Sequence, residues 1–335
     1  MKLCFVCTKG IRCGIAVYQL YLAKSLKKLG HDVRVIDIYR PINEIEQEVR
    51  EFRPDVLHLQ YEPAFGMIET FLGLGKMARR TVVTCHRPMM EHMPLFLKNF
   101  SGMVVHRDVP VQFHGPHLIK MPMAAPVFDK VDKQDARKAA GFPADARIIA
   151  TFGFISSYKG LDQVLACLIP GMKTRPDVYA AFMTSEHFMN PTSGETMERR
   201  MARIAKEGGI SDRFFHTTKF LSDEEMNRYL QAADLGLIWC GQNTGGNSAA
   251  ALQFITARIP SVVTESDHFH TLPNDACVRT PFDIGKFCDG VFATLDNPGL
   301  LKSLAEGAEK AYSTINYHEV GKRYVAFYER FQAGD

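Results

Sequence analysis

The chain has 335 residues, of which 46% are hydrophobic and 23% charged, a composition of soluble globular proteins that excludes disordered chains, collagens and small disulfide scaffolds. Lysine and arginine number 40 against 37 aspartates and glutamates, so the net charge of +3 predicts no general binding to polyanions. The length favours two domains, because a single hydrophobic core stops growing at roughly 250–300 residues.

The first part of the chain alternates short apolar runs with longer segments of helical period, which is the pattern of parallel βαβ units. Helices are expected over Ile15–Leu29, which ends at Gly30, and over Ile42–Phe52. Such units predict a doubly wound sheet, whose ligands bind beyond the carboxyl ends of the strands. The expected strands are Leu3–Cys7, Asp32–Ile38, Val56–Gln60, Thr81–Cys85 and Met103–His106.

The same pattern restarts after residues 126–145, which are rich in proline and charge and are expected to form a linker with a short helix. The expected strands of this second part are Arg147–Phe152, Val178–Met183, Phe214–Thr217, Leu235–Trp239 and Ser261–Thr264. The expected helices are Leu161–Leu168, Gly194–Glu207, Asp223–Ala233, Ser248–Ala257, Asp283–Leu295, Pro298–Tyr312 and Tyr317–Phe331.

We therefore predict an α/β protein with two Rossmann-like domains, over 1–125 and 146–315, joined by the linker 126–145. The last segment, 316–335, is expected to be a helix that packs back onto the body of the protein. A cleft between two such domains is a common place for nucleotide-linked chemistry, because pockets favour domain interfaces.

Eight cysteines are scattered along the chain, and the apolar runs around several of them indicate buried free thiols in a reducing cytosol. The N-terminal apolar run is too short for a signal peptide, and no stretch reaches the ~18 apolar residues that span a membrane. We therefore expect a cytoplasmic protein. The Met-rich segment Arg87–Phe100 fits an ordinary packed helix, but leaves open an acceptor groove or contact with a membrane surface.

Three glycine-containing loops precede expected helices. The first, TKGIRCGIAVY, places Gly10 and Gly14 between a strand and a helix, where a plain turn and a phosphate- or sugar-binding loop are both open. The second, GFISSYKG, places the ammonium of Lys159 at a helix start, where it can neutralise a diphosphate. In the third, NTGGNSAAALQFITARIPSVV, Asn247 or Ser248 can cap a helix whose N-terminus attracts anions.

In this order, the three stretches resemble retaining glycosyltransferases of the GT-B fold, specifically family 4 (glycosyl transferases group 1). The motif RCGIAVY is similar to the family's N-terminal loop, and FGFISSYKGLDQVL is similar to the opening of its second domain. The runs FLSDEEMNRYLQAADLGLIW and LQFITARIPSVVTES match later family elements in type and spacing. The resemblance spans nearly the whole chain and implies transfer of a sugar from a nucleotide-diphosphate donor to an acceptor, with retention at the anomeric carbon.

The resemblance also implies roles for individual residues. Lys159 and His86 would act at the reacting donor, as the diphosphate-binding lysine and the sugar-contacting histidine. Glu62 and Arg87 are acceptor-side candidates. The acceptor itself, whether glycan, lipid-linked sugar, small molecule or nucleic acid, cannot be read from the sequence, and neither can the oligomeric state. The donor-binding candidates are Arg12, Gly14, Ser157, Gly245, Gly246, Asn247, Ser248 and Gln253.

The chain departs from the family at its usual pair of glutamates, which are separated by seven residues and bind the sugar and the ribose. Their positions hold Gly245 and Gln253, so sugar recognition loses a carboxylate and ribose recognition loses charge assistance. The arginine that accompanies Lys159 is also missing, and Arg12 is a candidate to replace it. These losses keep open a catalytically silent protein that binds a sugar nucleotide or a partner. A 2-epimerase and a transferase acting on a nucleic-acid base are the minor alternatives.

No metal or other cofactor is expected. The chain has no D-x-D motif of the kind that holds a divalent ion on a sugar diphosphate. The CxxC at Cys4 and Cys7 lies in a strand that would place the two thiols on opposite faces, and no partner pair follows at zinc-site spacing.

Overall fold

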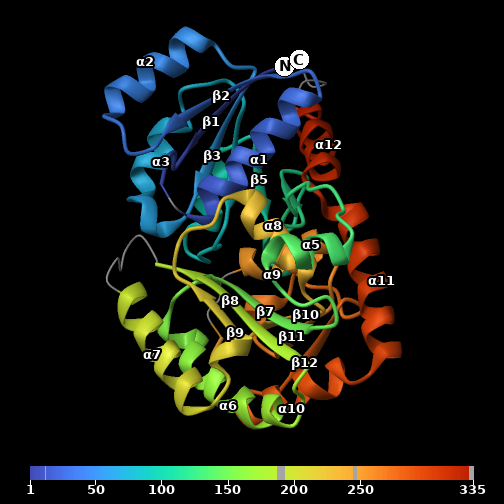
Figure 1. The fold of residues 1–335 in the computed structure, drawn as a ribbon. Coiled ribbons are helices and arrows are strands. Elements are labelled where there is room, and N and C mark those ends of the chain that lie inside the picture. Colours follow the sequence, from blue (N-terminus) through green and yellow to red (C-terminus); the bar gives the residue numbers. More distant parts are fainter. Residues whose placement is uncertain (12, 187–192, 244–246, 332–335) are drawn as a thin grey trace. The chain divides into compact units, whose positions relative to one another are not determined.

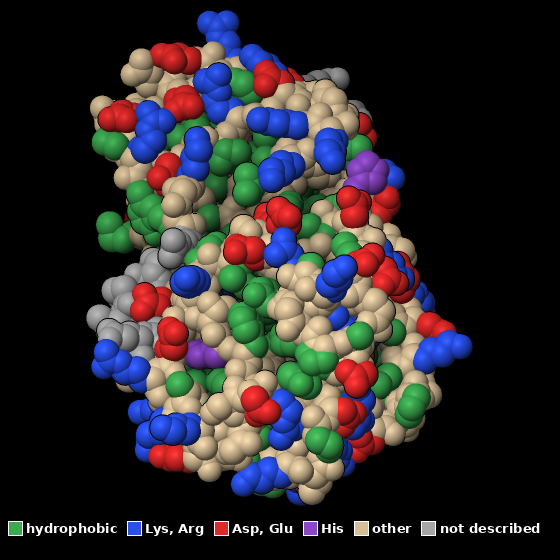
Figure 2. Space-filling model, in the orientation of Figure 1, with side chains coloured by type: hydrophobic (Ala, Val, Ile, Leu, Met, Phe, Trp, Pro, Cys, Tyr) green, Lys and Arg blue, Asp and Glu red, His purple; other side chains and the backbone are tan. Residues whose placement is uncertain are grey.

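The computed structural model describes residues 1–11, 13–186, 193–243 and 247–331. The chain divides into two compact units: unit 1 comprises 1–124 together with 315–335, and unit 2 comprises 125–314 (Figure 1). No described helix is long and apolar enough to cross a membrane. Basic and acidic side chains are interspersed over the face drawn in Figure 2, in keeping with the small net charge.

Unit 1 is built on a parallel sheet in the order β2-β1-β3-β4-β5-β6. Nearly every residue of β1, β3 and β4 is buried, because helices cover both faces of a parallel sheet. The five expected strands are present, and β6 is a sixth that the sequence analysis did not identify. The strands are β1 (Lys2–Cys7), β2 (Asp32–Asp37), β3 (Val56–Tyr61), β4 (Thr81–Cys85), β5 (Gly102–Val105) and β6 (Leu118–Lys120). The helices from the N-terminal part are α1 (Gly14–Lys28), α2 (Ile42–Phe52), α3 (Ile68–Leu74) and α4 (Met93–Asn99).

The C-terminal helix α12 (Tyr317–Glu329) packs into unit 1 against residues that are far from it in the sequence, and Figure 1 shows it in red beside the blue helix α1. Its tyrosines enter the interior, where Tyr324 Oη lies 2.7 Å from Tyr18 Oη of α1. At its far end a Cβ added to Gly102 would lie 2.6 Å from the Phe331 ring, so only glycine lets β5 approach this helix so closely.

Unit 2 repeats the architecture with a parallel sheet in the order β12-β11-β10-β7-β8-β9. Its sixth strand, β12, was not identified from the sequence either. The strands are β7 (Arg147–Phe154), β8 (Val178–Ser185), β9 (Phe214–Thr217), β10 (Leu235–Ile238), β11 (Ser261–Thr264) and β12 (Cys277–Thr280). The helices are α5 (Lys133–Ala140), α6 (Leu161–Lys173), α7 (Ser193–Glu207), α8 (Asp223–Ala232), α9 (Ala249–Ala257), α10 (Ile284–Leu295) and α11 (Pro298–Ile315).

Helix α6 runs to Lys173, five residues beyond the end that the sequence predicts at Leu168. Pro170 therefore lies inside the helix. Proline removes one backbone hydrogen bond from a helix. The apolar face nevertheless continues through Met172, which is fully buried. A Cβ at Gly171 would lie 2.2 Å from the Phe292 ring of α10, so this turn is packed tightly against its neighbour. Tertiary packing therefore overrides the helix-breaking signal.

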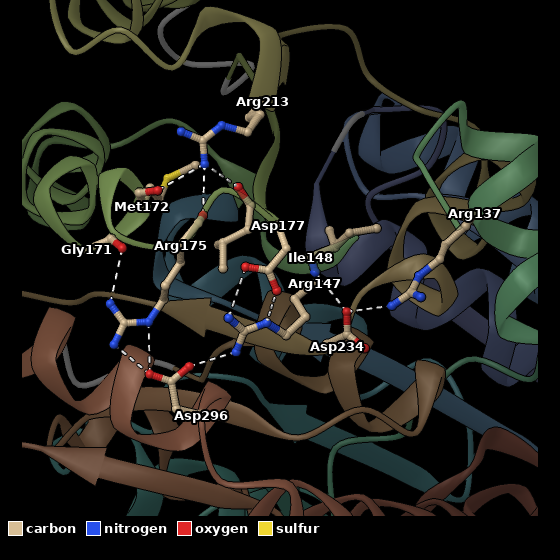
Figure 3. Close-up of polar contacts among 11 residues, drawn as sticks. Arg137, Arg147, Ile148, Gly171, Met172, Arg175, Asp177, Arg213, Asp234 and Asp296 are labelled. Carbon is tan, nitrogen blue, oxygen red and sulfur yellow. Dashed lines mark hydrogen bonds and ion pairs between the residues drawn. The ribbon is translucent and has the colours of Figure 1, made fainter. Parts of the chain in front are cut away.

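Ion pairs hold the amino-terminal edge of the unit 2 sheet together (Figure 3). Arg147, the first residue of β7, donates to Asp177 at 2.6 Å and to Asp296 at 2.7 Å. Asp234, just before β10, accepts from the backbone nitrogen of Ile148 at 2.8 Å and from the buried guanidinium of Arg137 in α5 at 2.7 Å. These contacts tie α5 and the strand starts to one another, at the edge opposite to the candidate site.

Candidate active site

The site in unit 2 begins where β7 ends at Phe154, in the interior of the sheet between β10 and β8. A short 3-10 helix over Ser157–Lys159 follows, and Gly160 caps the start of α6. Gly160 has φ +45 and Gly153, within β7, has φ +127, both in the region that favours glycine. The loop therefore turns sharply at the carboxyl end of the sheet and directs Lys159 inward, while Ser157 is exposed.

The ammonium of Lys159 is buried, with only 8% of the residue exposed. Its Nζ donates a hydrogen bond to the Phe154 carbonyl at 2.8 Å. Among the described residues no carboxylate is paired with it. Burial disfavours the charged form, which lowers the pKa of Lys159 from 10.5 to about 8. A buried cation without a counter-charge is costly, and a bound anion would supply the missing partner.

The N-terminus of helix α9 lies beside this ammonium. A Cβ added to Gly153 would lie 3.0 Å both from the Cβ of Ala250, in the first turn of α9, and from Lys159 Nζ. Ser248 caps the helix by accepting a hydrogen bond from the Ala251 nitrogen at 3.1 Å. The other amides of the first turn have no partner within the helix. The Lys159 ammonium and the positive end of the α9 dipole therefore create a positive electrostatic potential in the same region, which suits a phosphate group.

One turn further along α9, Gln253 is 8% exposed and its Oε1 is buried without a hydrogen-bond partner. A buried amide oxygen left unsatisfied is uncommon in folded proteins and indicates a ligand or water that completes it. Asn247 and Ser248 lie immediately before the helix, as expected. Gly245, Gly246 and Arg12, which the sequence analysis also assigned to donor binding, lie outside the described residues.

In unit 1, Gly14 is the first residue of α1, and the Cys13 Sγ caps that helix by accepting from the Ala16 nitrogen at 3.4 Å. Of the two loop glycines, Gly10 has φ +75, a backbone conformation that favours glycine, and Gly14 is not among the described residues with a positive φ. The structure thus explains Gly10 by its backbone conformation, and the donor-binding role of Gly14 stays a prediction.

The remaining candidates cluster at the carboxyl ends of β3 and β4, which are neighbours in the sheet. Glu62 follows β3, and its carboxylate lies 2.8 Å from the half-exposed guanidinium of Arg87. Burial raises the pKa of Glu62 above its usual value, although Arg87 acts in the opposite direction. His86, also after β4, is buried, and its Nε2 lies 2.7 Å from Gln60 Oε1. The structure therefore brings together three of the residues that the sequence analysis named separately.

The sequence analysis missed the polar interior behind His86. His58 and Gln60 alternate along β3 and Thr84 lies on β4, all fully buried. His58 contacts Thr84 Oγ1 at 2.7 Å and Tyr328 Oη at 2.5 Å, so both of its ring nitrogens have partners and it is a structural histidine. Polar residues at alternating positions of an otherwise apolar strand were the available signal, because such residues share one face of the sheet.

Cysteine, histidine and carboxylate side chains do not gather in groups of three or more that could hold a metal ion anywhere in the described part of the chain. All eight cysteines are free thiols, and seven of them are buried. Burial raises the pKa of Cys4 to about 12, so this thiol stays protonated.

No protein-family model matches the chain. A stretch of 189 residues, 55% of the chain, is 26% identical to the MMP alpha-(1->4)-mannosyltransferase of Mycolicibacterium hassiacum. That stretch covers 43% of the enzyme, so the chain spans less than half the length of this curated relative.

Solved structures resemble the chain over nearly its whole length. Anabaena Alr3699/HepE, in complex with UDP and glucose, is 14% identical with a TM-score of 0.74, covering 98% of this chain and 100% of that one. A glycosyltransferase from Rickettsia africae is 11% identical with a TM-score of 0.76, covering 100% and 99%. An alpha,alpha-trehalose-phosphate synthase (UDP-forming) from Burkholderia xenovorans is 10% identical with a TM-score of 0.70, covering 98% and 100%. These likenesses confirm the expected fold class: two Rossmann-like parallel sheets of the GT-B type.

Proposed function

We propose that the chain is a glycosyltransferase that moves a sugar from a nucleotide-diphosphate donor to an acceptor, with retention of anomeric configuration and without a metal ion. The observation that carries the proposal is the buried, carboxylate-free ammonium of Lys159 beside the N-terminus of α9. A diphosphate would supply the counter-charge that this ammonium lacks and would accept hydrogen bonds from the first turn of the helix. The solved structures with bound UDP support the choice of donor class.

In the proposed reaction, the bond between the anomeric carbon and the diphosphate oxygen breaks, and the departing diphosphate gathers negative charge. Lys159 and the amides before Ala251 would stabilise that charge by electrostatic preorganisation, so no acid–base residue is needed at the leaving group. The acceptor oxygen attacks from the same face, and its proton passes to the leaving phosphate. Gln253 is assigned to the ribose hydroxyls and His86 to the donor sugar, as the resemblance to family 4 implies.

The test is a panel of sugar nucleotides, including UDP-glucose and GDP-mannose, offered with sugar, sugar-phosphate and glycolipid acceptors. We expect nucleoside diphosphate to be released only when an acceptor is present, and proton NMR of the product to show the anomeric configuration of the donor. Turnover should persist in EDTA. The variant Lys159→Ala should lower turnover about 100-fold or more. The matched control is Lys173→Ala, which changes an exposed lysine at the end of α6, the helix that follows the Lys159 loop. Wild-type turnover in Lys159→Ala would contradict the assignment of the diphosphate site.

A silent sugar-nucleotide-binding protein is the second candidate, because an amide stands at Gln253 where the family has a carboxylate. This candidate predicts that UDP binds and that its affinity falls in Lys159→Ala. It also predicts that no donor of the panel is consumed with any acceptor. The same experiments therefore separate the two functions.

A further inference from the structure

A pocket lies in unit 2 at the amino-terminal edge of its sheet, the edge opposite to Lys159. Its volume is about 580 Å³, which is within the range of small-molecule sites. The walls come from the start of α5, the end of α9 and the first half of α11, together with the residues that precede β10 and β11. The proposed reaction uses none of these residues, so a ligand bound here would be additional to the sugar donor.

The lining of this pocket is positively charged. Among the described residues, four basic and two acidic side chains line it, which leaves a net charge of +2. The acids are engaged elsewhere in the fold, since Asp132 caps α5 and Asp234 pairs with Arg137 (Figure 3). The basic residues are Lys130, Lys133, Arg258 and Lys302. Lys130 and Lys133 each meet a carboxylate, and the other two do not in the described part of the chain.

Arg258 occupies a backbone position that usually holds glycine. It ends α9 with φ +57, in the left-handed conformation in which glycine is the common residue at a helix end. The guanidinium carbon lies 3.9 Å from the centroid of the Tyr312 ring, and Nη2 donates to the Phe128 carbonyl at 3.1 Å. The helix end is therefore strained, and two contacts fix the plane of the side chain that it carries.

The other donors of this guanidinium are unmet. Nε and Nη1 of Arg258 are buried and have no hydrogen-bond partner among the described residues. Two N–H groups side by side on a planar guanidinium match two oxygens of one anion. A cation that meets only neutral groups in a partly buried place is costly, and an anion in the pocket would offset that cost. Lys302, an exposed lysine of α11, lines the same pocket and adds a second unpaired charge.

We propose that this pocket binds a phosphate monoester, with Arg258 holding the phosphate and Lys302 as a second cation beside it. A phosphate monoester carries a charge of about −1.5 to −2 at pH 7, which balances the lining, whereas a carboxylate would balance half of it. The apolar lining residues Val131, Ile259 and Leu301 suit the organic part of the ligand.

This site is separate from the donor site and does not depend on the proposed function. Helix α9 has nine residues and so spans about 13 Å, with its N-terminus beside Lys159 and Arg258 at its other end. One phosphate group therefore cannot contact both cations. Each site has its own basic residue, so substitutions can test the two sites independently.

Phenyl phosphate is the probe, because it joins a phosphate to a small apolar ring. It is titrated by calorimetry into the full chain carrying Lys159→Ala, which removes the ammonium of the donor site. We expect one phenyl phosphate bound per chain in this background, and benzoate, with a single charge on the same ring, to bind several-fold more weakly. No binding in Lys159→Ala would overturn the proposal, and equal affinities for the two probes would overturn the assignment to a phosphate.

Further substitutions in the Lys159→Ala background identify the residues. Arg258→Gly should weaken phenyl phosphate binding about 10-fold or more, while the helix end is kept because glycine adopts its conformation without strain. Lys302→Gln should weaken binding about two- to fivefold, since its charge is exposed. Lys173→Gln, which changes an exposed lysine outside the pocket, should leave the affinity unchanged. If Arg258→Gly does not fold, Arg258→Gln replaces it. Unchanged affinity in the Arg258 variant would overturn the proposal.

Discussion

The buried ammonium of Lys159 is expected to lower the free energy of unfolding at neutral pH. The variant Lys159→Met tests this expectation. The pKa of the buried ammonium is about 8, against 10.5 for an ordinary lysine, a difference of roughly 2.5 units. At 1.36 kcal/mol per unit, holding the charge at pH 7 costs about 3 kcal/mol. Methionine removes this cost but leaves the Phe154 carbonyl without its donor, a loss of about 1 kcal/mol. The variant should therefore be more stable by about 2 kcal/mol at pH 7.

The difference in stability between wild type and Lys159→Met depends on pH. The folded-state pKa of Lys159 is lowered, so between pH 8 and 10.5 the unfolded chain binds the proton and the folded chain has released it. Wild-type stability should therefore rise over this range relative to Lys159→Met, and the advantage of the variant should disappear by about pH 10.5. Urea denaturation at several pH values measures this, with the exposed Lys173→Met as control. A variant less stable than wild type at pH 7 would refute the reasoning.

Three further outcomes follow from the same geometry. UDP affinity should be highest below pH 8 and fall up to about tenfold per pH unit above it, as titration calorimetry would show, because the ligand requires the charged form of Lys159. Gly153→Ala should destabilise the protein by about 1–3 kcal/mol in urea, since its Cβ would lie 3.0 Å from Ala250 Cβ at φ +127. Asp234→Ala should cost about 3–5 kcal/mol in the same assay, because it leaves the buried guanidinium of Arg137 without its carboxylate; an unchanged denaturation midpoint would show that the pair is not stabilising.

Hydrophobic periodicity predicts most of the sheet strands, because parallel strands covered on both faces are continuous apolar runs. The two strands that it misses lie at sheet edges and are short. Leu118–Lys120 has three residues, none of them buried, and Cys277–Thr280 has only its two ends buried. Edge strands bury less surface, so their sequences carry less of the apolar signal on which prediction depends. The end of α6 was misplaced for a different reason, since the packing that carries the helix past Pro170 is made with α10 and is not local.

In the candidate site, too, local sequence signals predict some residues, while others are brought together only by tertiary packing. Lys159 and Ser248 could be placed from the sequence, because each lies at a strand end or helix start that local glycines and caps mark. The pairing of Gln60 with Gln19 could not, since it joins residues 41 positions apart that meet only when α1 packs on β3. Alternation along β3 indicates that Gln60 shares a face with His58, but no rule of spacing says which side chain of α1 it meets.

The distribution of charge in unit 2 distinguishes structural from functional basic residues. At the amino-terminal edge of the sheet, the guanidiniums of Arg137, Arg147 and Arg175 each meet a carboxylate, and Arg213 donates to three backbone carbonyls (Figure 3). At the carboxyl edge, Lys159 is buried and has one carbonyl. If stability alone determined where ion pairs form, we would expect them at both the amino-terminal and the carboxyl edge of the sheet. A carboxylate beside Lys159 would offset the desolvation of its ammonium, but it would also occupy the place of an anionic ligand and repel it. The unpaired charge is therefore the feature to follow when a site of this kind is sought in a structure without ligand.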